Sequence, residues 1–519
     1  MAQMVPEIDQ HPVIGRQLFD VVTSGMYDNP LMIFREYLQN AVDSIDLGIQ
    51  VGSLTFEEAQ IQICLSGQDR TITIFDNGPG LTNGTAHTIL KSLGCSPKEG
   101  SNQRGFRGVG RLGGLAYCDE LIFETRGAKD EKVAVISWDR SAFESIASDT
   151  SHLVSLLETI EKVSTPSFRD AAKDEPEHFF KVTLKNVQRF HSDILMNLKV
   201  VQDYISQVAP VPYNAETFSF ASQLNEYFSL IEEPRCYRIS LNNRQIFRPY
   251  CDNIQVSTNV SETIQGVERF TFVGADSKPI ALGWYARTNL IASLPQVLNV
   301  RGMRIRQGNI EIGDEYFLEE QFTERRFASW HLGEIHIVGN RLKPNARRDG
   351  FEQSPDFERF LEQAAFLGRH LSSLCRKSSN TRIARCKAES SLQKLENIFS
   401  KPVTYIDKEH YVKTQGQAST LLQQVEKSVS GGMTPDFQAR LDSLKLKIDD
   451  NGNSPIFLDH ILDGRRLKHY DQKALMTHVA KVLVSSYSKS TSAEDILKDI
   501  FTSFTKEAYT EQPSLASLG

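Results

Sequence analysis

Three polar side chains near the start of the chain have the types and the spacing that could activate water beside a magnesium ion. Within residues 34–46, FREYLQNAVDSID, Glu36, Asn40 and Asp43 stand at i, i+4 and i+7, so a helix would present them on one stripe. A carboxylate can take a proton from water, and a carboxamide oxygen one turn away is a ligand that Mg²⁺ accepts. Polar triplets of this kind also occur on ordinary solvated helix faces, so the stripe alone leaves both interpretations open.

A second candidate is the turn DNGPG that follows a predicted strand. Residues 70–75 alternate between threonine and isoleucine, as a half-buried strand does, so Asp76 stands at the carboxyl end of that strand. Its carboxylate could accept a hydrogen bond from an exocyclic amine such as that of adenine. Gly78 and Gly80 would let the backbone approach a flat ring closely. An ordinary Asp-Asn-Gly turn without a ligand is the alternative.

The third candidate is a glycine-rich segment, RGFRGVGRLGG, at residues 104–114. Gly105, Gly108 and Gly110 precede apolar residues, and this pattern predicts a loop that leads into a helix N-terminus, where backbone N–H groups bind phosphate. A Rossmann turn is the usual competitor, but it would follow a strand directly. Residues 93–103 are instead polar and rich in Gly, Ser and Lys, as a mobile lid would be.

The surrounding sequence predicts the elements that must position these side chains. The helix is expected to begin after the cap and proline at 28–30 and to end at Gly48. Residues 141–177 contain an amphipathic stretch followed by a polar loop, and we expect a surface excursion there. Further strands are predicted at residues 121–125, 133–138 and 180–184.

In their order and spacing these three segments resemble the GHKL ATPase superfamily, the group of gyrase, the ninety-kilodalton heat-shock chaperone, histidine kinases and MutL. The resemblance implies an α+β protein whose ATP domain is a Bergerat-type α/β sandwich that binds ATP and Mg²⁺. It also implies that Glu36 is the general base, Asn40 the Mg²⁺ ligand and Asp76 the acceptor of the adenine amine. The other nucleotide contacts implied by the resemblance are Asp43, Gly78, Gly80, Lys98, Gly105, Phe106, Arg107, Gly108, Val109 and Gly110.

One segment departs from the family pattern. The last strand of the ATP domain usually opens with Gly-Thr, whereas the matching run here, residues 178–184, reads HFFKVTL. The resemblance therefore does not supply the threonine hydroxyl that normally helps to read adenine. Thr183, the threonine within this run, is a candidate strand residue that points elsewhere.

Length and pattern predict several domains in this chain of 519 residues. Short alternating runs separated by Asn, Gly and Pro turns indicate a second α/β domain, and apolar residues at i, i+3 and i+4 indicate a helical region after it. The predicted parts are an ATP-binding domain at 1–190, a connector at 191–234, the second domain at 235–375 and the helical region at 376–519.

The second domain ends in a basic loop, residues 339–353, just before a helix predicted at 355–367. From the residues alone, a solvated basic loop is an equal alternative to a functional one. In GHKL proteins of the chaperone and MutL type, a transducer domain with a ribosomal-protein-like fold follows the ATP domain and lends a cation to the γ-phosphate. By that resemblance Arg348 is the catalytic sensor, with Arg347 the nearest alternative. A guanidinium suits this role because its fixed donors match phosphate oxygens.

Arg301, Arg304 and Arg306 form a second basic run on a strand pattern, and alternation would place Arg304 and Arg306 on one face. They could contact a client, a partner or nucleic acid. We expect an ion-paired surface strand instead.

Composition limits the classes of function. The net charge of −7 gives no global reason to expect nucleic acid, and the seven cysteines form no CxxC pair or metal spacing. No apolar run approaches the roughly 18 residues of a membrane helix. We therefore expect a cytoplasmic protein that does not associate with a membrane.

The resemblance leaves two classes of function open. In the first, ATP hydrolysis drives closure of a homodimeric clamp, chaperone-like or MORC-like, on an unknown protein or nucleic-acid client, and bacterial relatives of this shape imply a link with defence systems. The alternative is a nucleotide-gated module that binds a partner or nucleic acid and uses hydrolysis only as a slow timer. A histidine kinase is set aside because only His11 precedes the acidic helix.

Overall fold

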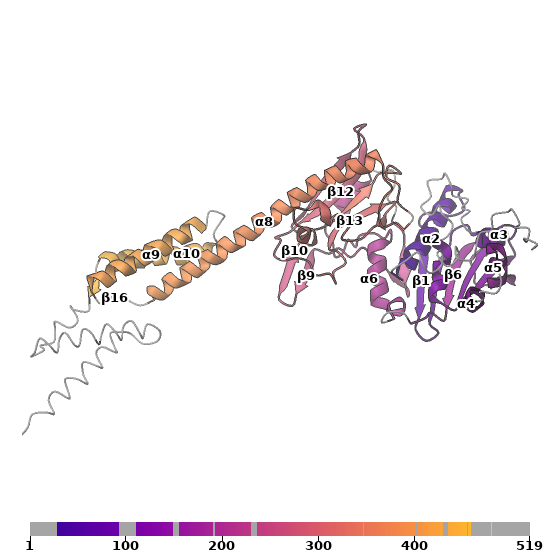
Figure 1. The fold of residues 1–519 in the computed structure, drawn as a ribbon, viewed down its shortest axis with the longest axis horizontal. Coiled ribbons are helices and arrows are strands. Elements are labelled where there is room, and N and C mark those ends of the chain that lie inside the picture. The colour runs from indigo at the N-terminus through magenta and orange to yellow at the C-terminus, as the bar shows by residue number, and fades with distance from the viewer. Residues whose placement is uncertain are drawn as a thin grey trace, which may run out of the picture. The chain divides into compact units, whose positions relative to one another are not determined.

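The computed structural model describes residues 29–92, 110–148, 155–189, 193–229, 236–345, 347–400, 403–405, 407–428, 434–453, 455–457 and 479. The chain forms two compact units, Met1–Cys375 and Arg376–Gly519. Each unit has its own buried apolar core. Figure 1 labels helices and strands of both units.

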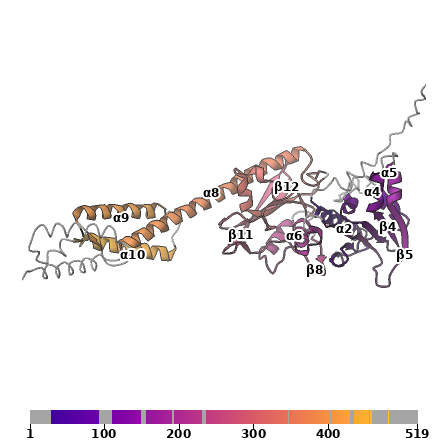
Figure 2. The same ribbon diagram turned by 60° about the horizontal axis from the view of Figure 1, so that its bottom comes forward.

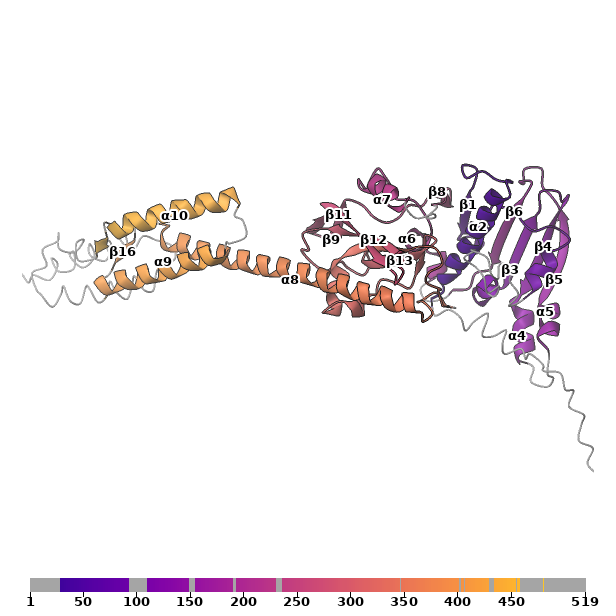
Figure 3. The same cartoon turned by 90° about the horizontal axis from the view of Figure 1, so that it is seen from above.

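Within the described residues, eight strands form the first sheet, in the order β5-β4-β3-β6-β2-β1-β7-β8 (Figure 3). Neighbouring strands are antiparallel except β1 and β7, which are parallel. The strands predicted at 121–125, 133–138 and 180–184 are found as β3, β4 and β6. The bounds are β1 (Ile61–Ser66), β2 (Thr71–Asp76), β3 (Glu120–Arg126), β4 (Lys132–Asp139), β5 (Ser164–Asp170), β6 (Phe179–Lys185), β7 (Ile239–Leu241) and β8 (Arg244–Gln245).

Helix α2 (Met32–Gln50) lies against one face of this sheet (Figure 3). Ile72 and Ile74 of β2 are buried in the same core as the apolar stripe of α2. Because side chains alternate along a strand, Asp76 points to the face that α2 covers. The apolar stripe of α2 consists of Phe34, Leu38, Ala41 and Ile45, all buried. The other helices around this sheet are α3 (Ala86–Lys91), η1 (Gly110–Tyr117), α4 (Arg140–Ser148), α5 (Leu156–Val163), η2 (Ile194–Met196) and α6 (Leu198–Val208), whereas α7 (Ala221–Phe228) packs in a separate apolar cluster.

The start of α2 differs from the prediction. The helix begins at Met32, and its N-cap position, Leu31, has no capping side chain. The carboxamide of Asn29 instead accepts a hydrogen bond from the backbone N–H of Leu31 at 3.0 Å, which makes a turn around Pro30 before the helix. The last helical residue is Gln50, so Gly48 lies inside the helix rather than at its end.

Three strands of this sheet come from segments that the sequence analysis assigned to other parts of the chain. Residues 164–170, part of the expected surface loop, form β5 at the edge of the sheet, a position where Pro166 removes no ladder hydrogen bond that the sheet needs. Strands β7 and β8, within residues assigned to the second domain, extend the first sheet because Ile239 pairs with Ile61 of β1. Pairing across that many residues leaves no local pattern in the sequence.

A second sheet follows in the same unit, and in the described chain it has the strand order β11-β12-β15-β13-β14 (Figure 2). Its faces are covered by two apolar clusters, one of which includes the first turns of helix α8 (Pro355–Ile398). The strands are β11 (Gly266–Val273), β12 (Pro279–Arg287), β13 (Gly302–Gln307), β14 (Ile310–Ile312) and β15 (Leu332–Ile337), with a separate hairpin of β9 (Asn253–Ser257) and β10 (Val260–Thr263). Two short helices, η3 (Glu319–Gln321) and η4 (Arg325–Trp330), precede β15.

A buried ionic cluster lies on β13 and β15. Glu334 is fully buried and pairs with Arg306 at 2.6 Å and with Arg248. Burial alone would raise the pKa of Glu334, but the two guanidinium groups hold this pKa well below its usual value. Burial lowers the pKa of the neighbouring His336 to about 4. The expected surface strand of arginines is therefore wrong in one respect: Arg304 and Arg306 are ion-paired, but both are buried.

The second unit is built from the end of α8, α9 (Lys408–Ser428) and α10 (Pro435–Asn453). A short pair of strands, β16 (Thr404–Tyr405) and β17 (Ile456–Phe457), accompanies them. The apolar positions predicted from helical spacing are buried at Ala388, Leu392, Leu395, Phe399, Phe437, Leu441 and Leu444. Residues 449–453, a polar run that contains Gly452, form the end of α10. In the parts of the chain that are described, no helix combines the length and the apolar character needed to cross a bilayer.

Candidate functional site

The polar stripe predicted on helix α2 is present. Glu36 and Asn40 are half-buried, and Asp43, one turn further on, is 1 % exposed. Neither the carboxylate of Glu36 nor the carboxamide of Asn40 forms a hydrogen bond or ion pair with any other residue that the structure describes.

The turn after β2 packs directly on the same helix. Asp76 is 3 % exposed, and its Oδ1 accepts a hydrogen bond from the N–H of Gly78 at 3.0 Å. A Cβ atom on Gly78 would lie 2.0 Å from Oγ of Ser44, the residue after Asp43 on α2. Only glycine allows this approach, so the first two predicted segments meet at Gly78.

Gly80 fixes the other end of the turn. It has a φ of +66°, and a Cβ there would lie 2.1 Å from the carbonyl oxygen of Arg126 on β3. The hydroxyl of Thr125 accepts from the N–H of Leu81 at 2.8 Å and donates to the carbonyl of Phe179 at 3.0 Å. No sequence pattern marks Thr125, because its contacts join three separate segments of the chain.

The end of the glycine-rich segment also contacts α2. Gly110 begins η1, a 3-10 helix rather than the predicted α-helix N-terminus. The Tyr37 hydroxyl donates to the carbonyl of Arg111 at 3.0 Å and accepts from the N–H of Gly114 at 3.1 Å. A Cβ on Gly114 would lie 2.2 Å from this hydroxyl, so the third segment is held against the helix of Glu36.

Other predicted contacts of this segment lie outside the described residues: Lys98, Gly105, Phe106, Arg107, Gly108 and Val109. The sequence analysis did not identify Arg111, whose guanidinium donates to the carbonyls of Ile89 at 2.7 Å and Ser92 at 3.1 Å. Arg111 thereby joins the start of η1 to the end of α3.

The strand that departs from the family pattern lies beside Asp76. Phe180 of β6 pairs directly with Asp76, whereas Thr183 pairs with Thr73, three residues back along β2. The expectation that Thr183 points elsewhere therefore fits this register. His178, just before β6, has its Nδ1 2.8 Å from the carbonyl oxygen of Gly78 and so holds the turn.

The basic loop after the second sheet reaches the start of α2. Nη2 of Arg35, the residue before Glu36, donates to the carbonyl of Arg347 at 2.9 Å. Arg348 is 9 % exposed and has a φ of +57°, and its carbonyl accepts from the N–H of Gly313 at 2.8 Å. The structure therefore brings both predicted sensor arginines into the neighbourhood of the acidic helix.

Arg35 was also missed by sequence reasoning. Its side chain is 4 % exposed, yet its Nε has no hydrogen-bond partner among the residues that the structure describes. Burial raises the pKa of Glu311 and that of Tyr204, and the positive charge of Arg35 opposes both shifts. Arg35 thus lies within electrostatic reach of Glu311 on β14 and of Tyr204 on α6.

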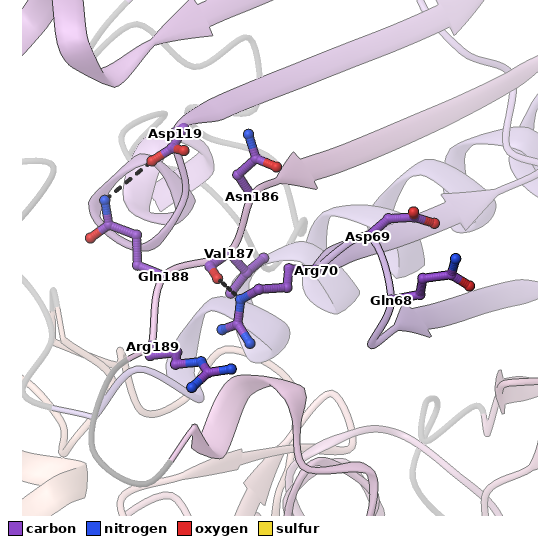
Figure 4. Close-up of a pocket in the computed structure, with 8 residues that line it drawn as sticks. All are labelled: Gln68, Asp69, Arg70, Asp119, Asn186, Val187, Gln188 and Arg189. Carbon is purple, nitrogen blue, oxygen red and sulfur yellow. Dashed lines mark hydrogen bonds between the residues drawn. The ribbon is translucent and has the colours of Figure 1, made fainter.

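A hollow at the opposite end of the first sheet is a separate feature (Figure 4). Arg70 dominates it: this side chain pairs with Asp193 at 2.7 Å and donates to the carbonyl of Val187 at 2.6 Å. These contacts join the β1–β2 turn to the segment after β6, so the arginine has a structural task. None of the predicted site residues lines this hollow, whose lining is Gln68, Asp69, Arg70, Asp119, Asn186, Val187, Gln188 and Arg189.

Comparison with known proteins agrees with this geometry. The family described as "Histidine kinase-, DNA gyrase B-, and HSP90-like ATPase" matches residues 35–170, from α2 to the end of β5. Among curated proteins, the chaperone protein HtpG of Psychrobacter arcticus is 30 % identical over 159 residues, 26 % of this chain and 23 % of the relative. HtpG of Acinetobacter baylyi is 32 % identical over 130 residues, 22 % of this chain and 20 % of the relative.

A longer match is HtpG of Geobacter metallireducens, 25 % identical over 231 residues, 41 % of this chain and 34 % of that protein. The chain thus spans between a fifth and about a third of the length of these relatives. The residues matched by the family model include α2, the turn after β2 and strands β1 to β5 of the first sheet. In this part the chain is similar to the GHKL ATPase superfamily, the group that includes the HtpG chaperones.

Proposed function

We propose that the protein binds ATP with Mg²⁺ at the junction of α2 and β2 and hydrolyses it. One observation supports this most strongly: the loop of Arg347 and Arg348 reaches α2 through the 2.9 Å hydrogen bond from Arg35. That contact places a cation-bearing loop beside the helix that carries Glu36. A general base and a charge stabiliser for a phosphoryl group would then lie on either side of one ligand.

The described residues fit such a ligand. Asp76 is a buried acceptor for an exocyclic amine, and Gly78 and Gly80 keep the adjoining backbone free of side chains. Among the described residues no cluster of His, Cys, Asp and Glu could hold a metal ion alone. Asn40 would therefore provide one oxygen ligand, and phosphate oxygens and water would complete the coordination that Mg²⁺ prefers.

In this proposal each residue of the chain has a defined task. Glu36 accepts the proton of the attacking water, Asn40 holds the metal, and Asp43 lines the nucleotide site. Bound Mg²⁺ supplies charge neutralisation to the phosphates. Arg348 contacts the γ-phosphate, where its fixed positive charge stabilises the charge that develops during transfer. Hydrolysis would then be promoted mainly by positioning and electrostatics.

At the level of the whole protein, we propose a chaperone-like or MORC-like cycle in which ATP closes a homodimer on a client in the cytoplasm. The ATP-binding domain would correspond to 1–190 with strands β7 and β8 added, followed by a connector at 191–234, a transducer within 235–375 and a helical region at 376–519. The identity of the client, protein or nucleic acid, would determine whether the protein acts in a defence system. Size-exclusion chromatography with and without a non-hydrolysable ATP analogue tests the dimer: closure of two chains predicts earlier elution with the analogue.

The experiment that tests the catalytic proposal is Glu36→Ala in the full-length chain. We expect ATP binding to persist while steady-state phosphate release falls by about two orders of magnitude or more, since a general base contributes about 10²–10⁴-fold. Glu57→Ala, which changes an exposed carboxylate, is the matched control and should leave both unchanged. Unaltered turnover in Glu36→Ala would refute the role of Glu36 as the general base. If turnover stops but partner capture survives, the nucleotide-gated binding module is the correct function.

A further inference from the structure

Phe180, the residue opposite Asp76 in the sheet, would lie beside the adenine or other heterocycle of a bound nucleotide. Asp76 on β2 pairs with Phe180 on β6, and Phe180 pairs in turn with Thr125 on β3. Residues directly opposite each other in antiparallel strands point to the same face, with Cβ atoms about 4.5–5.5 Å apart. Asp76, Phe180 and Thr125 therefore form one row on the face that α2 covers.

Thr125 cannot provide a hydrogen-bond donor to a ligand from this row. Its only hydroxyl hydrogen is donated to the carbonyl of Phe179 at 3.0 Å, and its oxygen accepts from the N–H of Leu81 at 2.8 Å. The side chain is also fully buried, at 0 % exposure. Thr125 is thus committed to holding the turn of Gly80.

Phe180 has a different character. It is half-buried at the margin of the core, and its ring centroid lies 6.1 Å from that of Phe123 in a tilted arrangement. A phenyl ring has no hydrogen-bond donor or acceptor of its own, but it offers an apolar face and a polarised edge to a flat heterocycle. Of the three side chains in the row, Asp76 alone can hydrogen-bond with a base, and a carboxylate only accepts.

We propose that Phe180 is a specificity-determining residue of the base site. The base is selected by one exocyclic amine, which donates to Asp76, and is held by contact with the Phe180 ring. No side chain of the row donates to the ring nitrogens that flank the amine. This inference rests on the proposed ATP binding, and it adds that the site requires the 6-amine of adenine but ignores N1 and N7.

Isothermal titration calorimetry of the full-length chain with Mg²⁺ and four nucleotides tests the inference. ATP is compared with 1-deaza-ATP and 7-deaza-ATP, which each lack one ring nitrogen, and with inosine triphosphate, which has a carbonyl in place of the amine. For the unaltered chain we expect both deaza analogues to bind within about twofold of ATP. Inosine triphosphate should bind at least roughly tenfold more weakly, because its oxygen faces a carboxylate that is then left without its donor.

Two variants at one position sharpen the experiment. Phe180→Thr introduces a hydroxyl next to Asp76, and a new neutral hydrogen bond should make ATP bind roughly fivefold more tightly than one of the deaza analogues. Phe180→Leu is the matched control, because leucine keeps an apolar side chain and should leave the analogues equal. If Phe180→Thr does not fold, the four titrations of the unaltered chain decide the matter.

The outcomes separate this inference from the proposal on which it rests. If ATP binds and either deaza analogue binds fivefold or more weakly, a donor to a ring nitrogen exists and the inference is wrong, while ATP binding stands. Equal binding of ATP and inosine triphosphate would show that Asp76 does not select the amine, and this result also overturns the inference. If none of the four nucleotides binds, the proposed function fails, and the inference fails with it.

Discussion

Arg35 is the residue at which the proposed mechanism can be tested most sharply, because its contribution to activity should be separate from its contribution to stability. Its Nη2 donates to the carbonyl of Arg347, which lies 312 residues away in the chain, and it directly precedes Glu36. Its Nε is buried and forms no hydrogen bond within the described part of the chain. A buried cation that is incompletely satisfied costs folding free energy, so its presence calls for another explanation. Holding the sensor loop against α2 is such an explanation.

The structure allows the effect of Arg35→Met to be estimated. Methionine keeps an unbranched, flexible side chain that can fill the buried space. The variant loses one charge-assisted hydrogen bond to the loop, which contributes about 1.5–3 kcal/mol. If docking of the loop is needed only for hydrolysis, this loss raises the barrier and slows turnover by about 10–150-fold. Removal of the unpaired Nε offsets part of the loss in folding, so the free energy of unfolding should change by less than about 1 kcal/mol.

Phosphate release at saturating ATP, ATP affinity by calorimetry and urea unfolding should be measured on the same preparations. We expect slower turnover with affinity within about threefold of the unaltered chain, since less than 1 kcal/mol of ground-state binding is at stake. Arg244→Met, which changes an exposed arginine on β8, is the control and should alter none of the three. Normal turnover in Arg35→Met would refute the coupling. A large loss of stability would show that the arginine is structural.

Three further predictions concern the sensor and the buried charges. Arg348→Ala should bind ATP with near-normal affinity but hydrolyse it at least tenfold more slowly, a barrier increase of about 1.4 kcal/mol, and an unchanged rate would move the sensor role to the preceding arginine. Glu334→Gln should lower the free energy of unfolding by about 3–5 kcal/mol in urea titrations, because it leaves two buried guanidinium groups uncompensated; a loss below 1 kcal/mol would contradict this. Burial lowers the pKa of His331 and of His336 to about 4, so the unfolded chain takes up protons below pH 6.5 while the folded chain does not. Stability should therefore be greatest above pH 6.5 and fall towards pH 4, by about 2 kcal/mol per histidine at pH 5, and His336→Gln should reduce this slope in unfolding experiments at pH 7.5 and 5.

The parts of the site that could be predicted from the sequence are those that depend on local periodicity. Glu36, Asn40 and Asp43 share a stripe because helical spacing alone fixes their direction, and Asp76 ends its strand because alternation stops there. The close approach of Gly78 to α2 could be expected only in general terms. Its actual partner, Ser44, follows from the packing of the helix on the sheet.

What could not be predicted depends on partners that are remote in the chain. Strand β7 reads as part of a later domain because its partner β1 lies far upstream, and no local pattern marks a parallel pairing. Arg304 and Arg306 look like surface residues, since charges are rarely buried without a partner. Their partners, Glu311 and Glu334, come from neighbouring strands whose pairing the pattern of alternation does not specify. The sequence therefore favoured exposure where the fold provides a buried counter-charge.

Helix α2 explains why such remote contacts matter for the proposed chemistry. Three of its side chains each contact a different segment: Arg35 binds the basic loop, Tyr37 binds η1, and Ser44 packs against the turn at Gly78. Glu36 lies between the first two of these contacts, so its backbone can move relative to a bound phosphate only if the helix or those contacts move as well. A rigid helix that is fixed at several points holds a catalytic group with the accuracy that proton transfer needs. It follows that the loop of Arg347 can influence hydrolysis without touching the attacking water, because displacing it removes one of the restraints on the residue next to the base.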